Sequence, residues 1–219
     1  DAFYLCFDYM GYAFEGNLYP LHDGWWIVMS HWCLDEDLTM YLDEENENGE
    51  PIPTIDDYLE QGKKYPQTML VYELKKHSSD EVEDLFVDLT IRKLEEHGLL
   101  DPERVMFISF SFHMCSRLAE KLPEFTVQYL EGNKKPSKVK ANGISGIDYN
   151  QTILSLNSKW IRNAHSNNMS VNVWTVNKEH DMEKMIGLGV DQITSDNPLS
   201  VRALLNKLNI REGTGNSVE

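Results

Sequence analysis

Carboxylate and lysine side chains recur at alternate positions near the ends of apolar runs in this sequence. Glu73 and Lys75 alternate in one run, and Glu15 and Asn17 alternate in another. Alternate residues of a β-strand share a face, and a charged side chain on a dry face is costly to bury unless a partner compensates it. A divalent cation or a plain Glu–Lys ion pair would each compensate the charge. The residue types alone leave both arrangements open.

Other polar residues also follow predicted strands. In parallel α/β folds, chemistry gathers where the strands end and the βα loops begin. The residues that share this placement are Glu15, Asn17, His31, Glu73, Lys75, Ser109, Ser111, Glu131, Asp148, Trp174, Asn177 and Asp196.

These placements depend on an alternation of strands and helices. Apolar runs near residues 15, 72, 107, 128, 148, 173 and 193 are each followed by a helical pattern, and residues 25–31 form another extended stretch. Helices are expected from a capping signature at residues 78–81 to Gly98, and over residues 113–121, 150–166, 179–188 and 199–208. The alternation predicts parallel strands with right-handed crossovers, either in a doubly wound sheet or in a closed (β/α)8 barrel.

The opening residues favour the barrel. Ala2, Phe3, Cys6, Phe7 and Met10 fall at helical spacing and Gly11 follows as a stop, so we expect the chain to begin inside a helix. The strand before that helix would then be missing from this chain, and restoring it would bring the domain to about 250 residues, the usual barrel size. We predict a (β/α)8 TIM barrel without its first strand, with a single domain over residues 1–208 and a polar tail over residues 209–219.

Composition excludes several classes of partner. The 219 residues carry 20 Lys plus Arg and 36 Asp plus Glu, a formal charge of −16. This balance argues against nucleic acid and against docking on anionic lipid. No apolar run approaches the roughly 20 residues of a membrane helix, so no integral membrane segment is expected. The compartment stays open between the cytoplasm and export with a removed leader, and so does the oligomeric state.

Several short motifs, in one order, resemble a known family. They are Phe14–Asn17, His22–Gly24, Ile27–His31, Ile52–Ile55, Glu73–Lys75, Val173–Asn177 and Gly189–Pro198. In this order they resemble the glycerophosphodiester phosphodiesterase family, whose members are (β/α)8 barrels. The likeness runs from residue 2 to about residue 208.

The resemblance implies a metal-dependent enzyme. Glu15, Asn17 and Glu73 would hold a divalent cation, Ca²⁺ or Mg²⁺, because hard oxygen ligands suit those ions. His31 resembles a catalytic histidine that acts as general acid or base. Lys75 would stabilise the charge that develops on the phosphate.

The same resemblance implies the substrate. Trp174 resembles an aromatic residue that lines the substrate cleft, and Glu131 is a further substrate-binding candidate. The expected partner is a small glycerophosphodiester, hydrolysed to glycerol 3-phosphate and an alcohol. The expected class is phosphoric diester hydrolase.

Three departures from the family pattern leave an alternative open. The family's opening His-Arg-Gly has no counterpart, Asn17 stands where an aspartate is usual, and Trp32 follows His31 where the family has an aspartate. A catalytically impaired barrel that binds a phosphorylated polyol or a partner would account for them. A lyase that forms a cyclic phosphate on the same barrel is a further alternative.

Overall fold

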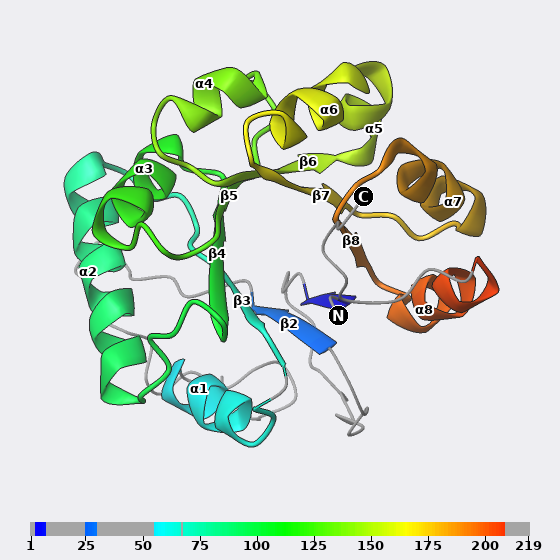
Figure 1. Ribbon diagram of the computed structural model, residues 1–219. Helices are drawn as coiled ribbons and strands as arrows, with labels where there is room; N and C mark the ends of the chain where they lie inside the picture. Colours follow the sequence, from blue (N-terminus) through cyan, green and yellow to red (C-terminus); the bar gives the residue numbers. More distant parts are fainter. Residues whose placement is uncertain (1–2, 8–24, 30–54, 67, 209–219) are drawn as a thin grey trace.

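The computed structural model describes residues 3–7, 25–29, 55–66 and 68–208. Eight parallel strands pair in chain order and close into a barrel, with β1 pairing both β2 and β8. Helices surround the strands (Figure 1). The predicted (β/α)8 barrel is therefore confirmed. The predicted strand at residues 14–19 and the polar tail lie outside the described residues, and the proposed domain limits stay a prediction.

The strands are short. They are β1 Phe3–Phe7, β2 Trp25–Met29, β3 Leu70–Glu73, β4 Val105–Ser109, β5 Val127–Tyr129, β6 Gly146–Asn150, β7 Ser170–Trp174 and β8 Gln192–Ser195.

The helices of the described residues follow the strands along the chain. They are α1 Ile55–Lys63, α2 Asp80–Glu96, α3 Phe112–Lys121, α4 Pro136–Lys140, α5 Gln151–Leu156, α6 Lys159–His165, α7 Glu179–Leu188 and α8 Pro198–Lys207. Within the described part of the chain, no helix has the length and apolar character needed to cross a membrane.

The opening of the chain differs from the sequence prediction. Phe3–Phe7 is β1, so the helix expected over residues 2–10 is wrong there. We expected the first strand of the barrel to be missing from this chain. Strand β1 instead occupies that position, between β2 and β8. The physical reason is that the run Phe-Tyr-Leu-Cys-Phe is continuously apolar and rich in aromatic residues. Such a run suits a strand of a parallel barrel, although its apolar residues also fit helical spacing.

Two helical predictions also need correction. The helix expected over residues 150–166 is two helices, because α5 ends at a C-cap on Asn157 and α6 begins after Ser158. Helix α4 was not predicted, since its five residues are too few to show a helical period. The bounds predicted for α7 and β8 agree with the structure to the residue.

Two apolar clusters lie on opposite faces of the strands. The larger cluster combines outward residues such as Tyr72 and Phe107 with helix residues such as Leu94 and Leu118. The smaller cluster contains strand and loop residues only, so it lies inside the barrel. Its members are Val71, Met106, Ile108 and Leu130, with Met69, Phe110 and Trp174 packed against them.

The barrel interior also contains a buried polar layer. The Gln128 side-chain amide donates to Ser170 Oγ at 2.9 Å and to Gln192 Oε1 at 2.8 Å. Gly146 makes room for this layer, because a Cβ there would lie 2.5 Å from Ser170 Oγ and 2.6 Å from Gln128 Cγ. A side chain at position 146 would therefore displace the polar layer.

Candidate active site

Glu73 and Lys75 lie together at the carboxyl end of β3. Lys75 Nζ is 2.7 Å from Glu73 Oε1, and the Glu73 residue is 5% exposed. The expectation that the two side chains share a face is confirmed. Their ion pair is one of the two arrangements that the sequence left open. The role of Glu73 as a metal ligand stays a prediction.

A chain of hydrogen bonds holds the end of β3 in place. Ser109 Oγ, at the end of β4, donates to the Leu74 carbonyl oxygen at 2.6 Å and accepts from Ser111 N at 3.0 Å. Ser111 Oγ donates to Glu83 Oε2 at 2.5 Å, and Glu83 Oε1 accepts from His77 N at 3.1 Å. The segment around Glu73 is therefore tied to β4 and to the first turn of α2.

Asp148 is a buried carboxyl group in β6 to which the sequence assigned no role. It is 1% exposed, and its Oδ1 accepts no hydrogen bond within the described part of the chain. Burial raises the pKa of this carboxyl to about 8, against a hydrogen bond from Asn172 that lowers it, and the charge of Glu73 raises it further. Asp148 and Glu73 thus act on each other electrostatically. The sequence signal was an aspartate inside the apolar run Gly-Ile-Asp-Tyr, at inward spacing.

Trp174 ends β7 and is half-buried. Its indole N–H donates to the Asp148 carbonyl oxygen at 2.9 Å, and its ring meets Phe110 edge-on, with centroids 5.7 Å apart. The ring is thus held at the carboxyl end of the barrel, where the sequence analysis expected a substrate-lining aromatic. Glu131 lies just beyond β5 and is exposed at the same end of the strands.

The loops after β7 and β8 are joined through Asn177. Its Oδ1 accepts from Asp196 N at 2.9 Å and from Ser195 Oγ at 3.1 Å, and its Nδ2 donates to Asp196 Oδ2 at 2.5 Å. Because Asn177 follows Trp174 by three residues, this network restrains the loop that begins after the aromatic residue.

The remaining predicted site residues are Glu15, Asn17 and His31, which lie outside the described residues. Their proposed roles therefore rest on the sequence.

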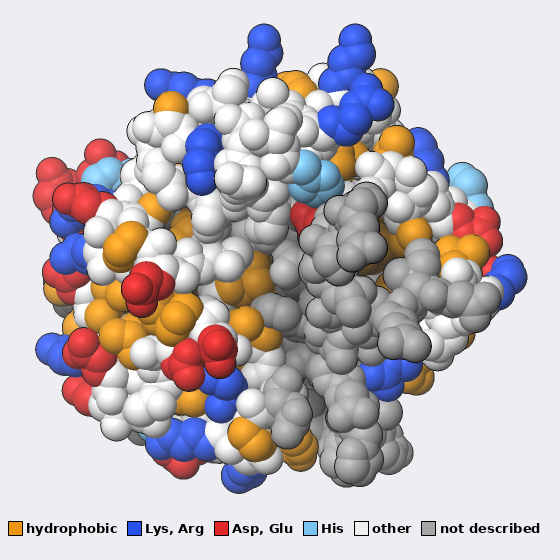
Figure 2. Space-filling model, viewed as in Figure 1, with side chains coloured by type: hydrophobic (Ala, Val, Ile, Leu, Met, Phe, Trp, Pro, Cys, Tyr) orange, Lys and Arg blue, Asp and Glu red, His pale blue; other side chains and the backbone are white. Residues whose placement is uncertain are grey.

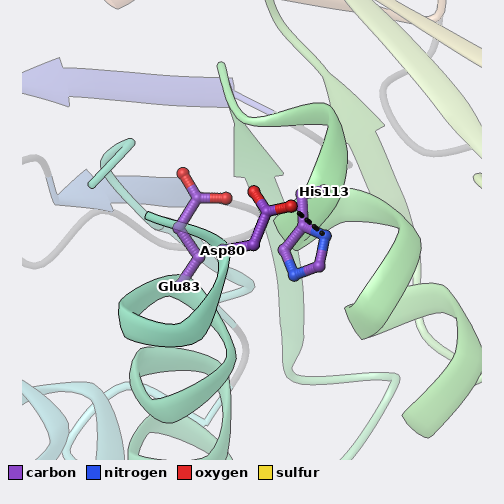
Figure 3. A group of neighbouring side chains, drawn as sticks. All are labelled: Asp80, Glu83 and His113. Atoms are coloured by element: carbon purple, nitrogen blue, oxygen red, sulfur yellow. Dashed lines mark ion pairs between the residues drawn. The ribbon is translucent and has the colours of Figure 1, made fainter. Parts of the chain in front are cut away.

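A second group of potential metal ligands lies on the helices. Asp80, Glu83 and His113 place ligand atoms within 4.8 Å of one another (Figure 3). His113 Nδ1 is 3.7 Å from Asp80 and its Nε2 is 2.9 Å from Asp84. Both Glu83 oxygens accept the hydrogen bonds described above. The group therefore already has partners for its polar atoms, and it belongs to the contact between α2 and α3.

The donor set inside the barrel fits a cation. Glu73 and Asp148 are two buried carboxyl groups. Lys75 forms an ion pair with Glu73. The charge of Glu73 raises the pKa of Asp148, whose Oδ1 accepts no hydrogen bond within the described residues, so negative potential from Glu73 reaches this part of the interior. Hard oxygen donors in such a potential suit Ca²⁺ or Mg²⁺.

Comparison with known proteins identifies the family. The Glycerophosphoryl diester phosphodiesterase family matches residues 16–200. The chain belongs to this family. Members of the glycerophosphoryl diester phosphodiesterase family are phosphoric diester hydrolases, which is the enzyme class that the sequence motifs implied. No curated protein sequence matches the chain.

Solved structures agree with the family assignment. A glycerophosphodiester phosphodiesterase from Parabacteroides distasonis is 32% identical, with a TM-score of 0.73, over 77% of this chain and 70% of that chain. A glycerophosphoryl diester phosphodiesterase from Silicibacter pomeroyi is 21% identical, with a TM-score of 0.65, over 74% and 59%. A phosphodiesterase from Oleispira antarctica, solved with sn-glycerol-3-phosphate, is 19% identical, with a TM-score of 0.60, over 71% and 62%. The last two likenesses concern the fold alone.

Proposed function

We propose that this protein hydrolyses small glycerophosphodiesters to glycerol 3-phosphate and an alcohol, with a divalent cation. The observation that carries the proposal is the family match over residues 16–200, together with a buried carboxylate–lysine pair at the end of β3, where the family motif Glu-x-Lys stands. Barrel enzymes do their chemistry at this end of the strands.

Glu73, with Glu15 and Asn17, would hold the cation, either Ca²⁺ or Mg²⁺. When bound, the cation supplies positive charge beside the phosphate oxygens. Asn17 offers a neutral amide oxygen, so the site depends on the two glutamates for its negative charge. Asp148 adds a further buried carboxyl group, whose pKa is raised by burial and by the charge of Glu73.

The other residues have separate tasks. Lys75 keeps its ammonium group beside Glu73 and stabilises the charge on the phosphate during in-line displacement. His31 donates or accepts the proton of the leaving or attacking oxygen. Trp174 packs against the glycerol or alcohol portion, and Glu131 on the rim accepts hydrogen bonds from hydroxyl groups.

The test is hydrolysis by the protein purified with whatever sequence precedes Asp1. We expect release of glycerol 3-phosphate from glycerophosphodiesters, and a loss of about 100-fold or more after excess EDTA, restored by Ca²⁺ or Mg²⁺. Activity that is unaffected by EDTA contradicts the metal-dependent mechanism. A cyclic phosphate product would assign the protein to the lyases instead.

The comparisons do not favour the non-catalytic alternative. The reasons to consider that alternative are the three departures from the family pattern: Asn17, Trp32, and the opening His-Arg-Gly that has no counterpart in this sequence. The upstream coding sequence separates the two functions. A His-Arg-Gly within about 35 residues before Asp1 supports the enzyme.

A further inference from the structure

The charges of this acidic chain are strongly segregated. Residues 132–178 carry seven Lys or Arg and one acidic residue, the buried Asp148, so this segment has a net charge of +6. The remaining residues carry 13 Lys or Arg against 35 Asp or Glu, a net charge of −22. The overall charge of −16 therefore conceals a basic region, and the expectation against anionic lipid, which used the net charge of the whole chain, does not apply to this region.

The basic residues gather on one side of the barrel. They lie on α4, on the α5–α6 segment and on the adjoining βα loops, and α4 contacts α6. Figure 2 shows Lys and Arg side chains clustered along the edge that carries α4 and α6 in Figure 1, away from the acidic side chains at either side. We call this surface the basic face. Its residues are Lys134, Lys135, Lys138, Lys140, Lys159, Arg162 and Lys178.

These cations differ from several elsewhere on the described surface. All except the half-buried Lys134 are exposed, and none is in an ion pair within the described part of the chain. On the opposite side, by contrast, Lys93 pairs with Asp56 at 2.9 Å and Lys121 pairs with Asp88 at 2.8 Å. The basic face therefore presents uncompensated positive charge.

An apolar side chain projects from the same surface. Leu156, the last residue of α5, is 80% exposed, the largest value among the large hydrophobic side chains of the described residues. It lies between Asn150 at the end of β6 and Lys159 at the start of α6. A surface that combines basic side chains with a protruding leucine is typical of interfacial membrane binding. Phosphates of a nucleic acid would offer the leucine no apolar partner.

We propose that the basic face docks on an anionic lipid bilayer and that Leu156 enters its interfacial region. The acidic remainder of the protein opposes docking weakly, because charges more than about 8 Å from the contact are screened at physiological ionic strength. Lys134, Lys135 and Lys178 lie on loops at the carboxyl ends of β5 and β7, so docking holds the mouth of the barrel beside the bilayer. This inference is independent of the proposed hydrolysis.

The first test is sedimentation of the protein with lipid vesicles. We expect binding to phosphatidylcholine vesicles that contain about 30% phosphatidylglycerol, with release at high salt, because each basic residue near the surface contributes about fivefold in partition. We expect no binding to vesicles of phosphatidylcholine alone. Absence of binding to the anionic vesicles at low salt, or equal binding to both kinds, overturns the proposal.

Matched variants locate the contact. Lys138→Glu/Lys159→Glu should weaken binding by about 25-fold or more, whereas Lys64→Glu/Arg92→Glu, which changes the net charge equally on the α1–α2 side, should retain it. Equal losses in both variants overturn the proposal. Thermal unfolding and hydrolysis of a soluble diester should be unchanged in Lys138→Glu/Lys159→Glu, since these exposed side chains make no ion pair within the described residues.

Leu156 distinguishes a bilayer from another polyanion. Leu156→Ser should weaken vesicle binding several-fold while the salt dependence is kept, because it removes apolar insertion and no charge. Unchanged vesicle binding by this variant overturns the choice of a bilayer. Binding of single-stranded DNA in place of anionic vesicles would also overturn it and would assign the basic face to nucleic acid.

Discussion

Two carboxylates of similar burial, Glu73 and Glu83, have different roles in this barrel. Glu73 ends β3 beside Lys75, whereas Glu83, 2% exposed, accepts hydrogen bonds from Ser111 and from the backbone of His77. The first faces the expected site of chemistry, and the second fastens a helix to two loops. Burial alone would not separate them, so their partners define their roles.

Glu73→Gln should therefore affect activity far more than stability. The amide oxygen can still accept from Lys75, but the charge that holds the cation is lost, so we expect hydrolysis to fall by about 100-fold or more. The midpoint of thermal unfolding should change little. Glu83→Gln is the matched control, and it should cost about 1–3 kcal/mol of unfolding free energy because one buried donor loses its acceptor. If Glu73→Gln mainly lowers the unfolding temperature, Glu73 is structural.

Asp148 should make stability depend on pH. Its folded-state pKa is about 8 and the value without the fold is 3.8, so between these values the folded protein binds the extra proton. Stability should fall as pH rises from about 4 to about 8, by up to about 1.4 kcal/mol per pH unit, and this contribution should be absent in Asp148→Asn. Urea unfolding of both proteins at pH 5 and pH 7.5 in EDTA measures the difference. Parallel changes in the two proteins would show that Asp148 is ionised throughout.

At the scale of elements, the loops after β3 and β4 position the site. Ser111 caps α3 by accepting from Met114 N at 3.1 Å, and the same hydroxyl donates to Glu83 in α2. Ser79 caps α2 by accepting from Val82 N at 3.4 Å. These hydrogen bonds connect the first turns of α2 and α3 to the end of β4. Together with the bond from Ser109 to the Leu74 carbonyl oxygen, they fix the position of the backbone next to Glu73.

Ser111→Ala should destabilise the protein without altering the charges of the site. The variant loses a helix cap and leaves a buried Glu83 oxygen without its donor, at a cost of about 1–3 kcal/mol. Ser116→Ala, in the same helix, removes only a hydrogen bond to the Phe112 carbonyl and should change stability by about 0.5 kcal/mol or less. Chemical denaturation of both variants measures the difference, and equal effects would contradict the role given to Ser111.

At the scale of the whole molecule, the barrel interior combines apolar and polar layers. Gly146 lets β6 approach Ser170 and Gln128 closely enough for the polar layer to form. The layer joins β5, β7 and β8 through side chains as well as through strand pairing. The packing of β6 against β5 and β7 therefore depends on a position where a side chain does not fit.

Gly146→Ala should lower stability by about 1–3 kcal/mol, because its Cβ would lie 3.0 Å from the Ser170 carbonyl oxygen as well as against side chains. Gly187→Ala is the control, since a Cβ there meets nothing within 4 Å and alanine favours helix α7. Calorimetry should show the first variant melting lower and the second unchanged or higher. The same result for both would contradict the close approach at Gly146.

The sequence predicted most elements because their signals are local. The bounds of α7 and β8 agreed with the structure, and the capping signature at residues 78–81 marked the start of α2. The prediction was wrong at Phe3–Phe7, where strand and helix periods both fit a short apolar run, and the barrel pairing decided for the strand. The break between α5 and α6 was missed for a related reason, since the apolar period continues through it.

The sequence by itself determined the alternation of strands and helices, the family motifs and the shared face of Glu73 and Lys75, because each depends on spacing along the chain. Only the tertiary structure brought the charge of Glu73 to bear on Asp148, closed the ring through β1, and gathered the basic residues of α4, α6 and the adjoining loops on one side. These features join segments far apart in the chain. Their energies depend on burial and distance, which residue order alone does not specify.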